Sequence, residues 1–232
     1  MSQTTLNITA IAIFSITMMS LVGPMVGLSP AVPALVAAGI LGAATVDRFG
    51  WEGRGGTLLV DWFARFSPTH RMRVIHHEAG HFLIAHLMDI PVTGYTLSAW
   101  EALRQGRQGR GGVEFDTKEV EVYLRQGELP VTVVERYNTV WMGGIAAEQM
   151  VYGNAQGGDD DRQNVRQLWQ MLKQPGEAGT RIRWGTLKAK TLLEKNRSAY
   201  DALVQAMDQN DALEQCIQII HEAQTSNPEA AS

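Results

Sequence analysis

The pattern of apolar and polar positions divides the chain into two parts of different character. Residues 1–45 contain no Asp, Glu, Lys, Arg or His, and the apolar run at 6–28 has the roughly 20 residues that a helix needs to cross a bilayer core. A second apolar run, residues 31–46, is shorter and richer in Ala and Gly. The pattern therefore predicts an N-terminal anchor over residues 1–46 with one or two transmembrane helices, which as a pair would form a hairpin.

Beyond residue 67 most apolar positions follow helical spacing. The predicted helical segments are residues 68–88, 131–152, a segment that begins at 159–161, and two or three helices within 181–223. Residues 92–99 and 111–116 are rich in β-branched and aromatic side chains and predict a small hairpin. We therefore expect a mainly α-helical protein with a small β element.

Composition shifts suggest where these parts begin and end. Residues 47–67 mix Gly, Arg and Trp, as is typical of a linker at a membrane interface, and residues 226–232 are polar and expected to be a disordered tail. One folded domain is expected between them, over residues 68–225. Several arginines follow the apolar region and none precedes it, so the positive-inside rule predicts that the chain after Asp47 is cytoplasmic. A cleaved signal peptide is the alternative, but its positively charged start is missing.

The charge and the cysteine content exclude several kinds of protein. The 232 residues carry a formal charge of −4, which is not the basic surface that nucleic-acid binding needs, so no nucleic-acid partner is expected. A single cysteine, Cys216, excludes a disulfide framework and a cysteine-rich zinc site. Any metal must therefore be held by His, Asp or Glu.

The strongest chemical signal is the stretch RVIHHEAGHFLIAHLMDIPV, within the first predicted helix of the domain. His77, Glu78 and His81 form the pattern H-E-x-x-H, and two histidines four residues apart on a helix face the same side. They can chelate one metal ion. Glu78 lies beside the pair, where it could accept a proton from a zinc-bound water whose pKa is lowered towards 7. The pattern predicts Zn²⁺-dependent hydrolysis with Glu78 as the general base.

The remaining histidines do not share this face. His76 lies to the side of His77 away from His81, and His86 is five residues beyond His81, so both are expected to pack or to support the site. His70 and His221 have no partner that the sequence reveals.

A catalytic zinc site needs a third protein ligand. Spacing does not decide among the available carboxylates, which are Asp89, Glu114, Asp116, Glu148, Asp159, Asp160 and Asp161.

Two segments of the chain resemble one protease family. HHEAGHFLIAHL resembles the protease helix of FtsH-type membrane zinc metalloproteases, and GGIAAEQMVYGNAQGGDDDRQNVRQL resembles the later family segment that reads roughly GRxAEExxFG and then TGAxNDxxxAT. The resemblance covers about residues 71–172. It implies a zincin-like peptidase domain behind a membrane anchor, with His77, His81 and Asp161 as metal ligands.

The chain also departs from that family. Ile145 stands where the family has Arg, and Val165-Arg166 replaces Ala-Thr, so packing or substrate binding near the site is expected to differ. The sequence contains no G-x-x-x-x-G-K-[ST] phosphate-binding loop. It therefore resembles the short FtsH-like proteins of photosynthetic lineages that lack the ATPase domain. Plasma or thylakoid membrane, with the peptidase domain on the cytoplasmic or stromal side, is the location that this resemblance implies.

Three functions fit these observations. The first is an ATP-independent, membrane-anchored zinc endopeptidase acting on unfolded or membrane-proximal polypeptide, alone, as a homo-oligomer, or with a separate ATPase or membrane complex. The second is a non-proteolytic assembly or scaffold factor that keeps the fold. The third is a site-2-type intramembrane protease, although Asp161 lies among polar residues and not in the apolar context of that family.

Overall fold

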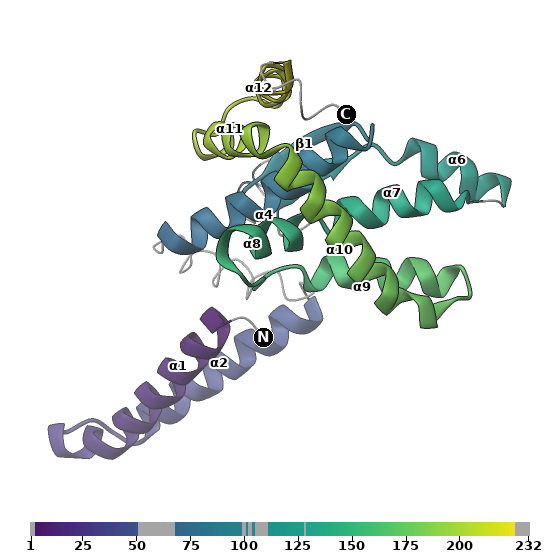
Figure 1. Ribbon diagram of the computed structural model, residues 1–232. Coiled ribbons are helices and arrows are strands. Elements are labelled where there is room, and N and C mark those ends of the chain that lie inside the picture. The colour runs from purple at the N-terminus through teal and green to yellow at the C-terminus, as the bar shows by residue number, and fades with distance from the viewer. Residues whose placement is uncertain are drawn as a thin grey trace. The chain divides into compact units, whose positions relative to one another are not determined.

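The computed structural model describes residues 3–50, 68–98, 101, 104, 111–127 and 129–225. Over these residues the chain is mainly helical and has one two-stranded sheet (Figure 1). It forms two compact units, one of Met1–Pro68 with Ser98–Arg110 and one of Thr69–Leu97 with Gly111–Ser232. The prediction of a mainly α-helical protein with a small β element is confirmed, whereas the zincin-like classification stays a prediction.

The first unit contains the apolar N-terminus. Helix α1 (Gln3–Val22) leads through the 3-10 helix η1 (Gly23–Val26) into helix α2 (Ala31–Gly50), and α1 contacts α2 (Figure 1). In the described part of the chain, Leu6–Val26 is the one segment long and apolar enough to cross a membrane. The apolar part of α2, Ala31–Asp47, is shorter, so by length only the first of the two predicted spans is supported.

The predicted boundary between anchor and linker changes slightly. Residues 47–50, expected to begin the linker, are the last residues of α2. The rest of that linker, residues 51–67, and the predicted tail, residues 226–232, lie outside the described residues.

Helix α4 (Pro68–Leu87) is the central helix of the second unit and ends one residue before the predicted limit. Its residues 79–85 are all buried, and side chains on different faces of the helix, among them Phe82, Leu83 and Ile84, belong to one hydrophobic core. A helix that buries apolar side chains all round its axis is a core helix. The metal-ligand motif therefore lies on a fixed element and not on a surface loop.

Helices α7 (Val131–Trp141) and α8 (Gly143–Tyr152) correct a prediction, because one helix was expected over residues 131–152. The helix is interrupted at Met142, which is followed by Gly143 and Gly144, and glycine has low helix propensity. Helix α8 ends at Gly153, which has the left-handed backbone (φ 76°) that commonly ends a helix.

Helix α8 crosses α4 at very close range, which its small residues allow. A Cβ atom added to Gly143 would lie 2.7 Å from the carbonyl oxygen of Gly80, and one added to Gly80 would overlap the backbone of Gly143. Neither position can carry a larger side chain without separating the two helices. This contact brings α8 against the face of α4 that carries the histidines.

The remaining elements surround this pair. Strands β1 (Val92–Thr96) and β2 (Gly112–Phe115) form an antiparallel hairpin in which Tyr95 pairs with Val113. Helices α9 (Asp159–Met171), α10 (Ala178–Lys195), α11 (Arg197–Asp208) and α12 (Leu213–Thr225) match the predicted helical segments. The sequence pattern did not predict the short amphipathic helix α6 (Lys118–Gln126) or the 3-10 turn η2 (Pro175–Glu177).

Candidate metal centre

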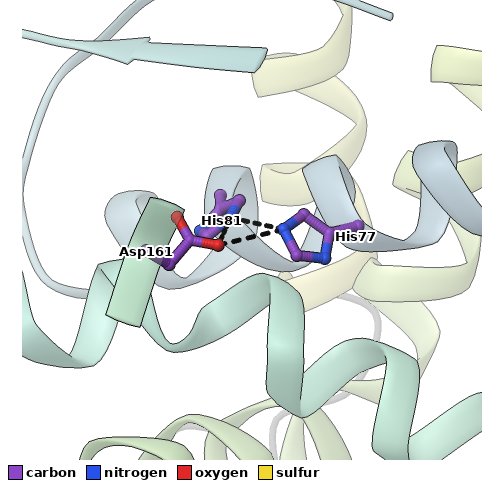
Figure 2. A group of neighbouring side chains, drawn as sticks. All are labelled: His77, His81 and Asp161. Carbon is purple, nitrogen blue, oxygen red and sulfur yellow. Dashed lines mark hydrogen bonds and ion pairs between the residues drawn. The ribbon is translucent and has the colours of Figure 1, made fainter. Parts of the chain in front are cut away.

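Two helices bring three potential metal ligands together. His77 and His81 come from adjacent turns of α4, and Asp161 comes from the first turn of α9 (Figure 2). The two Nε2 atoms are 3.0 Å apart, and Oδ2 of Asp161 lies 3.2 Å from Nε2 of His77 and 3.5 Å from Nε2 of His81. This is the one group of three or more possible ligand residues among those that the structure describes.

These separations match the geometry of a tetrahedral zinc site. With metal–ligand bonds of about 2.0–2.1 Å, any two ligand atoms of a tetrahedron are roughly 3.3 Å apart. The three measured separations, 3.0, 3.2 and 3.5 Å, bracket that value. An ion could therefore bind all three atoms with little movement of the side chains. Three protein ligands are the number that a catalytic zinc site uses.

The other nitrogen of each imidazole is held by a separate acceptor. Nδ1 of His77 donates to Oε1 of Glu148 at 2.8 Å, and Nδ1 of His81 donates to the carbonyl oxygen of Val140 at 2.8 Å. Because a carbonyl can only accept, the Nδ1 atom of His81 must carry hydrogen. These hydrogen bonds leave the two Nε2 atoms as the metal-facing nitrogens, which is how metal-binding histidines are usually oriented.

Glu148 supports the site and is not a third ligand in this structure, although it was one of the candidates. Its side chain is only 1% exposed and has four hydrogen-bond donors: His77, Arg73 at 2.8 Å, and the backbone N–H groups of Gln156 and Gly157 at 2.9 and 3.0 Å. A buried carboxylate with this many donors is fixed in place. It links α4 to the loop that leads into α9.

The same contacts determine the charges at the site. Burial alone would disfavour charge on His77, but hydrogen bonds to Asp161 and Glu148 outweigh it and raise the pKa of His77 to about 10. Burial likewise opposes ionisation of Glu148, yet the donors His77, Gln156 N–H and Arg73 lower its pKa to about 2. The pKa of Asp161 also falls below its ordinary value, because the nearby His81 and His77 outweigh its burial. Both carboxylates are therefore ionised at neutral pH.

Glu78 lies beside the ligands and contacts the hairpin. Its Oε2 accepts a hydrogen bond of 3.1 Å from the backbone N–H of Val113 in β2. The neighbouring Gly112 is also close, since a Cβ atom added there would lie 3.5 Å from Oε2 of Glu78. The sequence placed Glu78 next to the histidine pair, and the structure adds that a strand backbone holds its carboxylate.

Gly144 of α8 lies so close to His77 that only glycine fits at this position. A Cβ atom added to Gly144 of α8 would overlap the imidazole ring of His77. Two of the positions that depart from the resembled sequence pattern are buried near the site: Ile145 lies against Gly158, which precedes α9, and Val165 is buried in the same cluster. Arg166, the other replaced residue, is exposed.

The other candidate carboxylates do not join the group. Asp159 is 94% exposed and pairs with Arg162, and Asp160 is exposed. Asp116 accepts hydrogen bonds from Lys118 at the start of α6. Asp89 is an exposed residue just beyond α4, and Glu114 is an exposed residue of β2.

The histidines outside the motif pack as expected or find partners that the sequence did not reveal. Nδ1 of His76 lies 2.8 Å from the hydroxyl of Tyr200, so this histidine helps to attach α11 to α4. The rings of His86 and His221 meet edge to face with centroids 4.8 Å apart. His70 lies in the first turn of α4 and is exposed.

Sequence reasoning missed Arg73 and the carbonyl of Val140. Arg73 could have been suspected only after Glu148 was known to need a buried cation, and its guanidinium also lies 4.1 Å from the ring centroid of Tyr152. The role of the Val140 carbonyl could not be predicted, because every residue has a backbone carbonyl whatever its side chain.

Neither a protein-family model nor a curated protein matches this chain. The centre could hold a metal ion.

Proposed function

We propose that this protein is a membrane-anchored zinc metalloendopeptidase that hydrolyses peptide bonds without ATP. The observation that carries the proposal is the convergence of Nε2 of His77, Nε2 of His81 and Oδ2 of Asp161, each of the two rings being oriented through its Nδ1 atom. Two histidines that served only packing would not need a third, anionic group placed at metal-ligand distance from both.

The ligand types favour zinc over other ions. Two imidazoles and one carboxylate are a common catalytic zinc set, whereas calcium and magnesium prefer oxygen ligands alone. The combination of two histidines and one carboxylate also occurs at non-haem iron sites, in which the open positions bind oxygen and substrate. The glutamate directly after the first histidine distinguishes the two, because H-E-x-x-H supplies a base for water and iron oxygenases do not need one.

Each side chain has a defined task in the proposed hydrolysis. Zinc, when bound, supplies a Lewis acid that polarises the peptide carbonyl and lowers the pKa of water. Glu78 accepts the proton of the attacking water and returns it to the leaving amine, while the Val113 N–H holds its carboxylate in position. Glu148 and the Val140 carbonyl keep the two imidazoles in the orientation that presents Nε2.

The proposed substrate is unfolded or membrane-proximal polypeptide. The 232 residues contain no phosphate-binding loop, and the proposed source of the free energy that exposes a scissile bond is the substrate's own disorder or a separate ATPase. The hairpin of β1 and β2 is the element proposed to align an extended peptide, since strands bind such peptides through backbone hydrogen bonds. Its contact with Glu78 supports this role, because it places a strand next to the proposed base.

The membrane attachment is proposed from α1. Residues Leu6–Val26 are long and apolar enough to cross a bilayer, and apolar side chains such as Phe14 and Leu21 are exposed. Cytoplasmic or stromal placement of the second unit follows from the arginines after the apolar region.

The test combines zinc content with cleavage by the full chain in detergent or vesicles. We expect one zinc per chain and cleavage of an unstructured peptide, little cleavage of the same sequence inside a stable domain, and no effect of ATP. Glu78→Gln should keep zinc and lose cleavage by at least about a hundredfold, as expected for loss of general base catalysis. The matched control Glu214→Gln, which removes an exposed carboxylate of α12, should retain activity.

Two results would contradict the proposal. Absence of cleavage above the Glu78→Gln background while zinc is bound would favour a scaffold role. Cleavage of only the folded substrate, and only with ATP, would mean that a co-purifying ATPase is required.

A further inference from the structure

The outer face of α10 is an exposed surface that the proposed peptidase function does not use. Its inner residues Gly185, Ala189 and Leu193 are buried, and α10 packs against α7, α8 and α9 (Figure 1). Trp184 and Leu187 point the other way and are 64% and 56% exposed. Large apolar side chains that lie together on a polar helix face usually mark a contact surface.

The helix that carries this face is also strongly basic. Helix α10 carries five Arg and Lys residues and one glutamate, a net charge of +4, whereas the whole chain has a formal charge of −4. Arg181 pairs with Glu135, and Lys190 pairs with Glu194. Among the described residues, the structure records no ion pair for the remaining three cations, which are Arg183, Lys188 and Lys195.

We propose that the outer face of α10, defined by Arg183, Trp184, Leu187, Lys188 and Lys195, binds the anionic phospholipid headgroups of the membrane that anchors the chain. Trp prefers the membrane–water interface, and basic side chains beside it are attracted to anionic lipids. The proposal rests on the membrane attachment proposed for α1, but it does not depend on peptidase activity.

A membrane fits this face better than a second copy of the chain. Two copies meeting through the same surface would bring their unpaired cations together, which is unfavourable. A membrane tether, in contrast, keeps the face close to a lipid surface at high effective concentration, so even weak headgroup contacts become populated.

The face also offers a recess for a headgroup. A cavity of about 240 Å³ lies between α7 and α10, and its lining includes Trp184 and Lys188 together with Arg181 and Glu135, which pair with each other. Phosphate oxygens in this recess would meet the Lys188 ammonium, while Trp184 and Leu187 would reach the acyl boundary. Such contacts would hold the second unit at the bilayer surface, where membrane-proximal polypeptide is found.

The experiment places a nitroxide spin label on this face of the full chain in vesicles. The label replaces Thr191, an exposed residue on the same side of α10, as Thr191→Cys, and the native Cys216 is buried. Ser198→Cys on α11 gives a control label. Vesicles of phosphatidylcholine alone are compared with vesicles that also contain phosphatidylglycerol, and the collision rates with oxygen and with a water-soluble nickel chelate report how far each label is shielded from water.

We expect the Thr191 label, and not the Ser198 label, to be shielded from the nickel chelate in the anionic vesicles only. The double variant Arg183→Gln/Lys188→Gln should reverse this shielding, because each cation contributes roughly fivefold to binding and the pair about 30-fold. The matched variant Lys118→Gln/Arg125→Gln removes two exposed charges from α6 and should leave the shielding unchanged.

Three outcomes would overturn the proposal. The first is equal exposure of the Thr191 label in both kinds of vesicle. The second is magnetic coupling between Thr191 labels of different chains, which would assign the face to a second copy. The third is failure of the chain to float with the vesicles, which would remove the membrane attachment; zinc-dependent cleavage of a soluble peptide would be unaffected by any of the three.

Discussion

Oε1 of Glu148 lies 2.8 Å from Nδ1 of His77, on the opposite side of the ring from the Nε2 atom that meets Asp161. The imidazole is thus held between two carboxylates with different tasks. Glu148 fixes the tautomer and the orientation of the ring, and Asp161 shares the position that a metal would fill. This relationship separates a candidate ligand from a supporting residue among carboxylates that helical spacing left equivalent and that only the family resemblance ranked.

Removal of Asp161 should weaken zinc binding by at least about tenfold, since the ion would lose its only anionic protein ligand. Asp161→Ala is compared with Asp159→Ala, which changes a 94% exposed carboxylate of the same helix turn. Zinc affinity is measured by competition with a chromophoric chelator. Equal affinity in Asp161→Ala and wild type, with a loss in Asp159→Ala, would show that the ligand is wrongly assigned.

Replacement of Glu148 by Gln should reduce zinc affinity by roughly 10- to 100-fold, the usual cost of losing a hydrogen-bond partner behind a ligand. The amide keeps the shape of the side chain but no longer carries the charge that stabilises the Nδ1–H donor. Glu194→Gln, an exposed change on α10, is the control, and the same chelator competition reports affinity. An unchanged affinity in Glu148→Gln would mean that the ring is oriented without this carboxylate.

Zinc affinity should rise with pH across the neutral range. The pKa of His77 in the metal-free protein is raised to about 10, so this histidine is protonated near pH 7 and must release its proton when metal binds. Affinity should therefore increase by about tenfold per pH unit for one released proton and level off only as the pH approaches about 10. Calorimetry in buffers of different ionisation enthalpy measures the protons released. A pH-independent affinity between pH 6 and 8.5, without proton release, would contradict the expected protonation state.

The close approach of Gly144 to the His77 ring can be tested with one added methyl group. Gly144→Ala should displace the ring and lower zinc affinity by at least about tenfold, as losses of ligand orientation do, while circular dichroism still reports a helical protein. Gly176→Ala is the matched control because no heavy atom lies within 4 Å of the added Cβ. Retained affinity in Gly144→Ala would mean that helix α8 can move away from the site.

The membrane attachment and its sidedness give a further expectation. The full chain should remain in the pellet after alkaline extraction of membranes, because an apolar helix of the length of Leu6–Val26 is held by the hydrocarbon core. Protease added outside sealed right-side-out vesicles should leave the second unit intact. Digestion of that unit from outside would reverse the predicted orientation, and release by alkali would argue against a spanning helix.

Features that depend only on residues close together in the sequence could be predicted from the sequence. The shared face of His77 and His81 follows from helical periodicity, and the end of α8 at Gly153 follows from the left-handed conformation that glycine adopts easily. The apolar start of the chain and the beginning of α9 near Asp159 were equally local signals. In each case the feature is determined within a single helix, so the residue pattern of that segment is enough to predict it.

Helical spacing left open which distant groups complete the candidate centre; the family resemblance implied Asp161, and the tertiary structure shows where Asp161 and Glu148 lie. Glu148 lies on α8 and Asp161 on α9, far along the chain from His77, and the packing of both helices determines which nitrogen each carboxylate meets. Gly80 and Gly143 allow the close crossing of α8 over α4. The predicted single helix over residues 131–152 ends at Trp141 instead, and Val140, one of the last residues of α7, offers its carbonyl to His81. The last carbonyls of a helix have no donor within the helix, so their hydrogen-bond partners depend on which groups pack nearby. The periodicity of one segment carries no information about those neighbours.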